Sequence, residues 1–252
     1  MLKKRIIPVL LLRKGRLVKP IKFDKYRDVG DPVSQAKIYD AQLADELIFL
    51  DMDATSEKRF DTVDIIRKVA KECFMPLTVG GGIRSLEDIN TLLKAGADKI
   101  SINSIAVENP DFIREASERF GSQCIVVSID VKKTAKGYEV FTQNGKKATR
   151  LEAVEWAKRT AGLGAGEILI TSIDNEGTSE GYDLNITKAI CDAVNIPVIA
   201  HGGAGTLEDF YDAFEKAGAS AVAAGSLFCF TDQSLIKTRR YLKVHEVSVR
   251  TG

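Results

Sequence analysis

Residues 77–104 read LTVGGGIRSLEDINTLLKAGADKISINS, and residues 198–226 read VIAHGGAGTLEDFYDAFEKAGASAVAAGS. The two stretches share a glycine loop, an acidic helix start and a second strand, with Gly82 and Gly203 separated by 121 residues. Two further segments, ADELIFLDMD and AGEILITSID, keep the same offset. Solenoid repeats span about 20–50 residues. A period close to half of the 252-residue chain therefore indicates two halves of one domain.

Each half contains four strand–turn–helix units. Segments such as SLEDINTLLKAGA carry apolar residues at helical spacing and separate short apolar runs that are typical of strands. The runs are IIPVLL, ELIFLD, PLTVG, KISIN, CIVVSID, EILITSI, PVIAH and AVAAGS. Such units predict an α/β fold, a (β/α)8 TIM barrel over residues 1–252 with half-barrels at about 1–121 and 122–252. An open doubly wound sheet is the alternative, but it gives no reason for two-fold repetition.

The composition is that of a compact enzyme. Hydrophobic residues make up 44% and charged residues 28%, and the net charge of +1 provides no basic footprint for a nucleic acid. No apolar stretch approaches the ~20 residues of a membrane span, and no cleaved signal is evident, so we expect a cytoplasmic protein without membrane contact. Four separated cysteines and two histidines predict neither a disulfide nor a metal site, and no organic cofactor is expected.

Glycine loops follow the third and seventh expected strands, at the barrel end where active sites lie. Each loop opens onto a helix, whose first backbone N–H groups can bind an anion. The donors expected there belong to Gly81, Gly82, Asn103 and Ser104 on one side and to Gly202, Gly203, Gly225 and Ser226 on the other. One glycine loop is more often a tight turn than a site. Its duplication predicts two phosphate sites and a substrate with a phosphate at each end.

Acidic residues end three of the expected strands at the same end of the barrel. Partial burial raises the pKa of such a carboxyl toward neutrality, which suits general acid–base catalysis. Asp130, at the end of strand five, is the first candidate. The other candidates are Asp51 and Asp53 after strand two, and Asp174 and Glu176, followed by Gly177, after strand six. For the three aspartates among these, loop capping or ion pairing is an equally good explanation.

Several motifs in one order resemble the cyclase subunit of imidazole glycerol phosphate synthase over nearly the whole chain. They are LTVGGGIRS, ADKISIN, FGSQCIVVSID, AVEWAK, LGAGEIL, GYD and PVIAHGGAG. The resemblance implies a barrel that forms a heterodimer with a glutaminase docked at its base and receives ammonia from it. It also implies that ammonia attacks a bisphosphorylated ribulosyl intermediate of histidine synthesis, giving imidazole glycerol phosphate and a carboxamide nucleotide. Two aspartates, at the ends of strands one and five, act as acid and base in that family.

The resemblance assigns roles to further residues. Asp130 matches the second of those aspartates, and Lys19, in the loop expected after strand one, matches a mobile lysine associated with closure over the substrate. Asp98 matches an acidic residue that faces the glutaminase. The residues that match an ammonia gate at the barrel floor are Arg5, Glu46, Lys99 and Glu167, and those that match the polar wall of a tunnel above it are Thr78 and Ser101.

Physical chemistry alone explains the floor residues more simply. Four ionisable side chains at the starts of strands would converge at the base, where a paired network is tolerated and an unpaired charge is costly. They would then form a structural plug of salt bridges. The resemblance favours a gate that passes a small neutral molecule, and one network can serve both purposes.

Residues around the mouth depart from the family pattern. Leu11 stands where the family has the catalytic aspartate of strand one, and a leucine cannot transfer a proton. Asp53 replaces a small hydroxyl residue, Glu176 a shorter aspartate and His201 a serine. Loss of a positioned acid or base costs ~10²–10⁴ in rate, so we expect a slow cyclase unless Asp53 substitutes. For His201, contact with a phosphate as a cation and simple exposure in a loop are equally good expectations.

Intact ammonia-handling residues beside an altered mouth lead to our main hypothesis, an ammonia-using synthase subunit whose acceptor has diverged from the histidine pathway. Relatives with an altered first strand are associated with bacterial surface-polysaccharide pathways, where ammonia helps convert a sugar's acetamido group to an acetamidino group. Two alternatives stay open. One is the histidine-pathway cyclase itself, and the other is a non-catalytic barrel that only activates and tethers its glutaminase.

Overall fold

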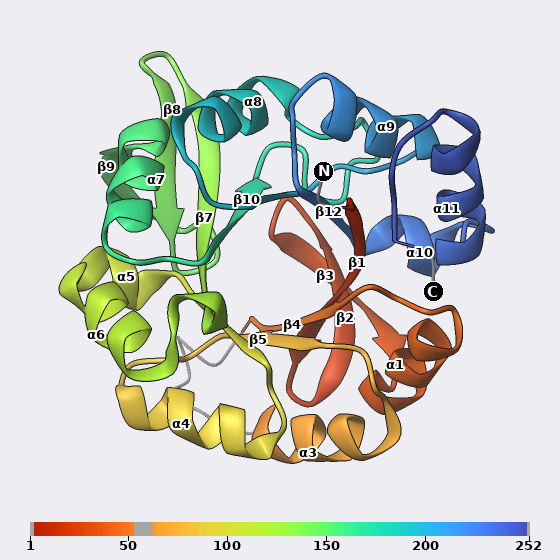
Figure 1. Ribbon diagram of the computed structural model, residues 1–252, viewed down its shortest axis with the longest axis horizontal. Helices are drawn as coiled ribbons and strands as arrows, with labels where there is room; N and C mark the ends of the chain where they lie inside the picture. The colour runs from red at the N-terminus through yellow and green to blue at the C-terminus, as the bar shows by residue number, and fades with distance from the viewer. Residues whose placement is uncertain (1–2, 53–61, 251–252) are drawn as a thin grey trace.

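Parallel strands of the described chain close into a barrel. The computed structural model describes residues 3–52 and 62–250, and Figure 1 shows a ring of strands inside a layer of helices. Each of the eight barrel strands in these residues pairs with the next one along the chain, and β12 pairs with β1 to close the ring. The predicted (β/α)8 TIM barrel is confirmed. Closure excludes the open doubly wound sheet, which would leave two edge strands.

The barrel strands coincide with the apolar runs of the sequence. They are β1 (Arg5–Arg13), β4 (Leu47–Asp51), β5 (Leu77–Gly80), β6 (Lys99–Ile102), β7 (Ile125–Thr134), β10 (Glu167–Ser172), β11 (Val198–His201) and β12 (Ala221–Ala224). Most of their residues are buried, because one face of each strand lines the barrel and the other packs on helices.

Helices cover the outside of this ring. They are α1 (Pro32–Ala41), α3 (Thr62–Glu72), α4 (Leu86–Ala95), α5 (Ser104–Glu108), α6 (Asp111–Phe120), α7 (Ala153–Gly162), α8 (Leu184–Ala193), α9 (Leu207–Glu215), α10 (Ser226–Phe230) and α11 (Leu235–Val244), with a 3₁₀ turn at Ser122–Cys124. Their buried residues recur at helical spacing. Thus α4 buries Ile89 and Leu92, and α9 buries the equivalent Phe210 and Ala213. None of the described helices is long and apolar enough to cross a bilayer.

Two antiparallel hairpins, absent from the predicted strands, extend two of the barrel strands at the mouth. The first consists of β2 (Arg16–Ile21) and β3 (Asp24–Gly30), and the second of β8 (Gly137–Thr142) and β9 (Lys147–Glu152). The prediction that Lys19 lies in a loop is wrong, since Lys19 belongs to β2 and pairs with β3. In Figure 1 this hairpin lies across the ring of strands.

Two apolar layers stabilise the barrel. The inner layer fills the space inside the strands and includes Ile7, Ile48, Leu169 and Ile199, each fully buried. The outer layer lies between the strands and the helices and contains most of the other buried apolar side chains. The barrel is therefore a packed core whose mouth and floor carry the polar residues, as expected for this fold.

The helices that follow the two glycine loops begin with the same capping box. Ser85 Oγ accepts the N–H of Asp88 at 3.2 Å, and the Asp88 carboxylate accepts the N–H of Ser85 at 2.9 Å. Thr206 and Asp209 make the equivalent bonds at 3.4 and 2.8 Å. The boxes satisfy N–H groups that a helix start leaves unpaired. They thereby fix where each glycine loop ends.

Removing either cap should destabilise the barrel by a similar amount. We expect Ser85→Ala and Thr206→Ala each to lower the free energy of unfolding by about 1 kcal/mol. The double variant should show the sum, because the two boxes share no partner. Urea unfolding followed by circular dichroism measures the change. Thr206→Ser keeps the hydroxyl and should stay within about 0.5 kcal/mol of the parent. If Thr206→Ser lost as much free energy of unfolding as Thr206→Ala, the threonine methyl group and not the hydroxyl would be responsible.

Candidate active site

A cavity of about 260 Å³ opens at the carboxyl ends of the barrel strands. Its lining brings together residues that are far apart in the sequence and are predicted to meet at this end. They are Leu11, Asp51, Gly81, Gly82, Asn103, Ser104 and Asp130, joined by Ser101, Thr171 and His201. Within residues 3–52 and 62–250, no group of three histidine, cysteine or acidic side chains is arranged to hold a metal ion.

Asp130 is a buried carboxyl group of β7. Asn103 Nδ2 donates to its Oδ2 at 2.9 Å, and Ser128 Oγ lies 3.5 Å from its Oδ1. Burial raises the pKa of Asp130 to about 7, and hydrogen bonds from Asn103, Ser128 and Thr171 oppose that rise. A carboxyl group with this pKa populates both protonation states near neutral pH, as general acid–base catalysis requires.

Leu11 places an apolar side chain at the end of β1. It is 2% exposed and belongs to the apolar cluster inside the barrel, together with Val9 and Met52. The family resemblance implies an aspartate at this position, so strand β1 contributes no acid to the cavity. The predicted substitute, Asp53, lies outside the described residues.

The two remaining aspartate candidates lie in different places. Asp51 lines the cavity and accepts a hydrogen bond from Thr62 Oγ1 at 2.7 Å. Asp174 does not reach the cavity, because its carboxylate accepts the N–H of Lys133 at 2.9 Å in a separate groove beside Tyr138. That contact is the loop capping that we considered equally good for Asp174.

The first glycine loop faces the cavity with its backbone. Gly81 and Gly82 have φ angles of 107° and 70°. A Cβ atom on Gly81 would lie 2.3 Å from the carbonyl oxygen of Asp51, so the close approach of the loop to β4 requires glycine. Asn103 precedes α5, and its Oδ1 is buried without a hydrogen-bond partner among the described residues. Backbone N–H groups at a helix start suit an anionic ligand, whereas the Asn103 amide oxygen is an acceptor and suits a ligand atom that donates a hydrogen bond.

The second glycine loop repeats this backbone geometry in a much smaller space. Gly202 and Gly203 have φ angles of 91° and 107°. The other residues predicted for this side gather around them, namely Glu176, Gly177, Gly225 and Ser226. The space that they enclose is about 10 Å³, which is room for roughly one water molecule. The two loops are equivalent in sequence, but only the first opens onto a large cavity.

The β2–β3 hairpin explains the difference between the two loops. Lys19 is buried beside Gly225, and its Nζ donates to the carbonyl of Val9 at 2.7 Å. The N–H of Lys22 donates to the carbonyl of Glu176 at 2.8 Å. Burial lowers the pKa of the Lys19 amine. The hairpin thus lies closed over the second loop and fills part of it with a lysine side chain.

His201 is buried at the end of β11, so the expectation that it is exposed in a loop is wrong. Its Nδ1 lies 3.1 Å from Thr171 Oγ1, and its Nε2 lies 3.8 Å from Glu176 Oε2. Burial lowers the pKa of His201, Glu176 opposes this effect, and Lys19 adds to it. The imidazole is therefore neutral at pH 7, which does not favour contact with a phosphate as a cation. Its ring lines both the main cavity and the space at the second glycine loop.

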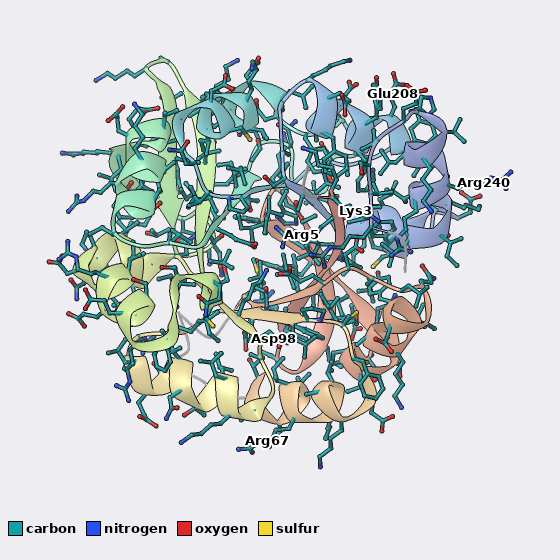
Figure 2. The ribbon with its side chains drawn as sticks, viewed as in Figure 1. Lys3, Arg5, Arg67, Asp98, Glu208 and Arg240 are labelled. Atoms are coloured by element: carbon teal, nitrogen blue, oxygen red, sulfur yellow. The ribbon has the colours of Figure 1, made fainter. Side chains whose placement is uncertain are left out.

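A closed ring of ion pairs forms the barrel floor. Arg5 contacts Glu46 at 2.8 Å and Glu167 at 3.0 Å, and Lys99 contacts the same two carboxylates at 2.9 and 3.1 Å. The hydroxyl of Thr78 also donates to Glu46. Figure 2 shows Arg5 inside the ring of strands, whereas Arg67, Glu208 and Arg240 lie on outer helices. Two acids and two bases balance their charges, which makes their burial tolerable.

Apolar side chains fill most of the barrel between floor and mouth. Ile7, Ile48 and Leu169 lie two positions beyond floor residues on their strands and are fully buried. Thr78 belongs to the floor network, and Ser101, two positions beyond Lys99 on β6, lines the mouth cavity. Asp98, which the resemblance places on the side that faces the glutaminase, is exposed, and its carboxylate accepts the N–H of Leu77 at 2.8 Å.

Prediction from the sequence missed several cavity residues, among them Ser128 and Thr171 next to Asp130 and three residues of the hairpin turns. Phe23, Gln143 and Asn144 come from the hairpin turns and line the cavity. The N–H of Gln143 donates to Ser104 Oγ at 3.4 Å, and the Asn144 side-chain amide donates to the carbonyl of Met52, just after β4. An Asn-Gly pair, here Asn144-Gly145, is a strong hairpin signal. It marks the turn of the second hairpin, but nothing local indicates that this turn lies over the mouth.

Comparison with known proteins adds two findings. The family described as histidine biosynthesis protein matches residues 5–234. A relative named imidazole glycerol phosphate synthase subunit HisF, from Alkaliphilus metalliredigens, is 52% identical over 251 residues, which cover 99% of this chain and 100% of the relative. Both findings confirm the resemblance that the sequence motifs indicate, and neither name refers to a polysaccharide pathway.

Breaking the floor ring should destabilise the barrel more than breaking a surface pair. We expect Arg5→Met to lower the free energy of unfolding by about 3 kcal/mol or more, because two buried carboxylates lose a partner. Arg67→Met removes an exposed contact with Asp64 and should cost no more than about 1 kcal/mol. Chemical unfolding of both variants measures the difference. Equal losses would show that the floor ion pairs do not stabilise the fold.

Burial of Asp130 should make stability depend on pH. Its folded-state pKa of about 7 exceeds the unfolded value of about 3.9, so folding favours the protonated acid. The cost of ionisation is absent below about pH 4, grows up to about pH 7 and is constant above it. We therefore expect Asp130→Asn to be more stable than the parent by up to about 4 kcal/mol at pH 8 and to show little difference at pH 4.

Thermal unfolding between pH 4 and pH 8 measures this gain. Glu118→Gln neutralises an exposed carboxylate on α6 and serves as the matched control, for which we expect no such trend. A gain for Asp130→Asn that is the same at both ends of the range would mean that Asp130 does not titrate near neutrality.

Proposed function

Because the chain belongs to the family of histidine biosynthesis proteins, we propose that it is the ammonia-using cyclase subunit of an imidazole glycerol phosphate synthase. In the proposed reaction, ammonia attacks the bisphosphorylated ribulosyl intermediate, and ring closure yields imidazole glycerol phosphate and a carboxamide nucleotide. The description of the family names histidine biosynthesis, and the name of the relative is that of an imidazole glycerol phosphate synthase subunit. Together they support this alternative better than our main hypothesis from the sequence, sugar amidination, which has no support beyond the altered first strand.

One observation carries the proposal. Asp130 is buried in the same cavity as the first glycine loop, and its pKa of about 7 suits a group that both donates and accepts protons. The loop and the N–H groups at the start of α5 would bind one phosphate of the substrate and hold its reacting carbon near Asp130. Addition of ammonia, loss of water and ring closure each require proton transfers, which Asp130 can supply.

The floor supports delivery of ammonia from below. A charge-balanced ring such as that of Arg5, Glu46, Lys99 and Glu167 repels no neutral molecule, and the apolar layer above it favours ammonia over ammonium. We propose that rearrangement of these ion pairs admits ammonia from a glutaminase subunit bound at the base. The exposed carboxylate of Asp98 lies at that end and would face the partner. The term subunit in the relative's name is in keeping with such a complex.

Leu11 favours a second candidate function. Without an acid on β1, the barrel would turn over slowly and act chiefly by binding a phosphorylated ligand and activating its glutaminase. In that case Asp130 would contact the ligand without transferring a proton. The floor network would be needed for both candidates, so it does not distinguish them.

Turnover of the isolated chain with an ammonium salt distinguishes the two candidates. For the cyclase we expect release of imidazole glycerol phosphate from the ribulosyl intermediate, with a kcat that Asp130→Asn lowers by ~10²–10⁴. Glu118→Gln, on the outer surface, should leave the rate unchanged. The absence of product, together with ligand-stimulated glutamine hydrolysis in a mixture with the glutaminase, would instead establish the second candidate. Product formed equally well by Asp130→Asn would contradict the role of Asp130.

A further inference from the structure

Three neighbouring strands place three polar side chains side by side at the mouth. Asp130 of β7 is in register with Thr171 of β10, and Thr171 is in register with His201 of β11. Residues in register on adjacent parallel strands point to the same side of a sheet. All three line the main cavity, so this side is the interior of the barrel.

The three side chains form a row. The Thr171 hydroxyl neighbours the Asp130 carboxylate across the β7–β10 pair and helps to lower its pKa, and the Thr171 oxygen lies 3.1 Å from His201 Nδ1. The other ring nitrogen, Nε2, faces Glu176 Oε2 at 3.8 Å. All four residues are buried. A hydroxyl group between an acid and an imidazole is both donor and acceptor, so it can pass a proton in either direction.

The proton count of this row has two consistent arrangements. When Asp130 is ionised, the Thr171 hydroxyl donates to the carboxylate, and His201 must then donate from Nδ1 to the Thr171 oxygen. When Asp130 is protonated, its O–H donates to Thr171, the hydroxyl donates to Nδ1, and the imidazole proton is on Nε2. The second arrangement contains one proton more than the first. A proton that binds at Nε2 therefore appears on Asp130 after the Nδ1 proton moves to Thr171 and the Thr171 proton moves to Asp130.

We propose that His201 is the second proton-transfer residue of this site and exchanges protons with Asp130 through the Thr171 hydroxyl. This inference deepens the proposed cyclase function, and its catalytic part rests on that function. His201 is well placed for the role, because β11 is separated from β1 only by β12 and the ring lines the cavity. It would supply the proton exchange that Leu11 at the end of β1 does not.

The charged surroundings of His201 keep the ring neutral, as the row requires. Three titratable groups face it from the packed elements, namely Asp130 through Thr171, Glu176 from the loop after β10, and Lys19 from β2. Burial and Lys19 lower the pKa of His201, and Glu176 opposes them. A neutral ring can exchange its proton between Nδ1 and Nε2, whereas an imidazolium has both sites filled.

Nitrogen NMR of the full chain tests the exchange without any substrate. The sequence contains two histidines, His201 and the exposed His245 after α11, so His245→Asn assigns the signals and serves as a control that leaves the site intact. On raising the pH through about 7, where Asp130 titrates, we expect the His201 proton to move from Nε2 to Nδ1. The two nitrogen shifts should then move in opposite directions. Formation of an imidazolium on lowering the pH would instead move both nitrogens to the protonated position.

Two variants identify the path. Asp130→Asn removes the titrating acid, and Thr171→Val removes the hydroxyl while keeping the shape of the side chain, so both should abolish the opposite movement of the two shifts. Thr171→Ser keeps the hydroxyl and should preserve it. Persistence of the movement in Thr171→Val, or its absence in the parent chain, would overturn the inference. If Thr171→Val does not fold, Asp130→Asn and Thr171→Ser still decide the question.

Kinetics with an ammonium salt tests the catalytic part. We expect His201→Asn to lower kcat by ~10²-fold or more with a KM change below about threefold, and His245→Asn to have no effect. A parent chain that makes no product would refute the proposed function, while the NMR result would stand by itself. A parent chain that is active, together with a fully active His201→Asn variant, would refute the role of His201 alone.

Discussion

The closed parallel barrel imposes one constraint on which the rest of the structure depends, namely that alternate residues of every strand must point inward. On β1 this rule places Arg5 at the floor, Ile7 and Val9 in the packed interior and Leu11 at the mouth. On β7 it leads from Val126 in the interior to Asp130 at the cavity. Strand length and register therefore decide which residue types can meet, and a single strand carries structural and chemical residues in fixed order.

Much of the fold could be predicted because its signals are local and repeated. Each apolar run became a barrel strand, and the shared pattern of glycine loop and acidic helix start became two equivalent capping boxes at Ser85 and Thr206. Both hairpins were missed, although the second has a recognisable turn at Asn144-Gly145. The first continues directly from β1, so no separate apolar run marks it. The position of both over the mouth depends on tertiary packing, which no local pattern encodes.

The residue types at the site could be predicted better than their environment. Their positions at strand ends correctly predicted that Asp51, Asp130 and the first glycine loop line one cavity. They did not place Asp174, whose carboxylate is held by the backbone of Lys133, and they did not show that His201 is buried. These outcomes depend on which partner each side chain contacts. The partner belongs to a neighbouring strand or loop, so it cannot be inferred from the sequence of one strand.

The buried Lys19 beside Gly225 has a consequence for the order of events at the mouth. The proposed substrate, with a phosphate at each end, could bind one phosphate at Gly81 and Gly82, whereas Lys19 and the β2–β3 hairpin would have to move before the opposite loop could bind the other. Binding of such a substrate would then take place in two steps, with movement of the hairpin as the second. The released lysine, regaining its charge in water, would become attracted to the same anion that displaced it. A molecule with a single anionic end would complete only the first step, so the hairpin would favour ligands long enough to reach both loops.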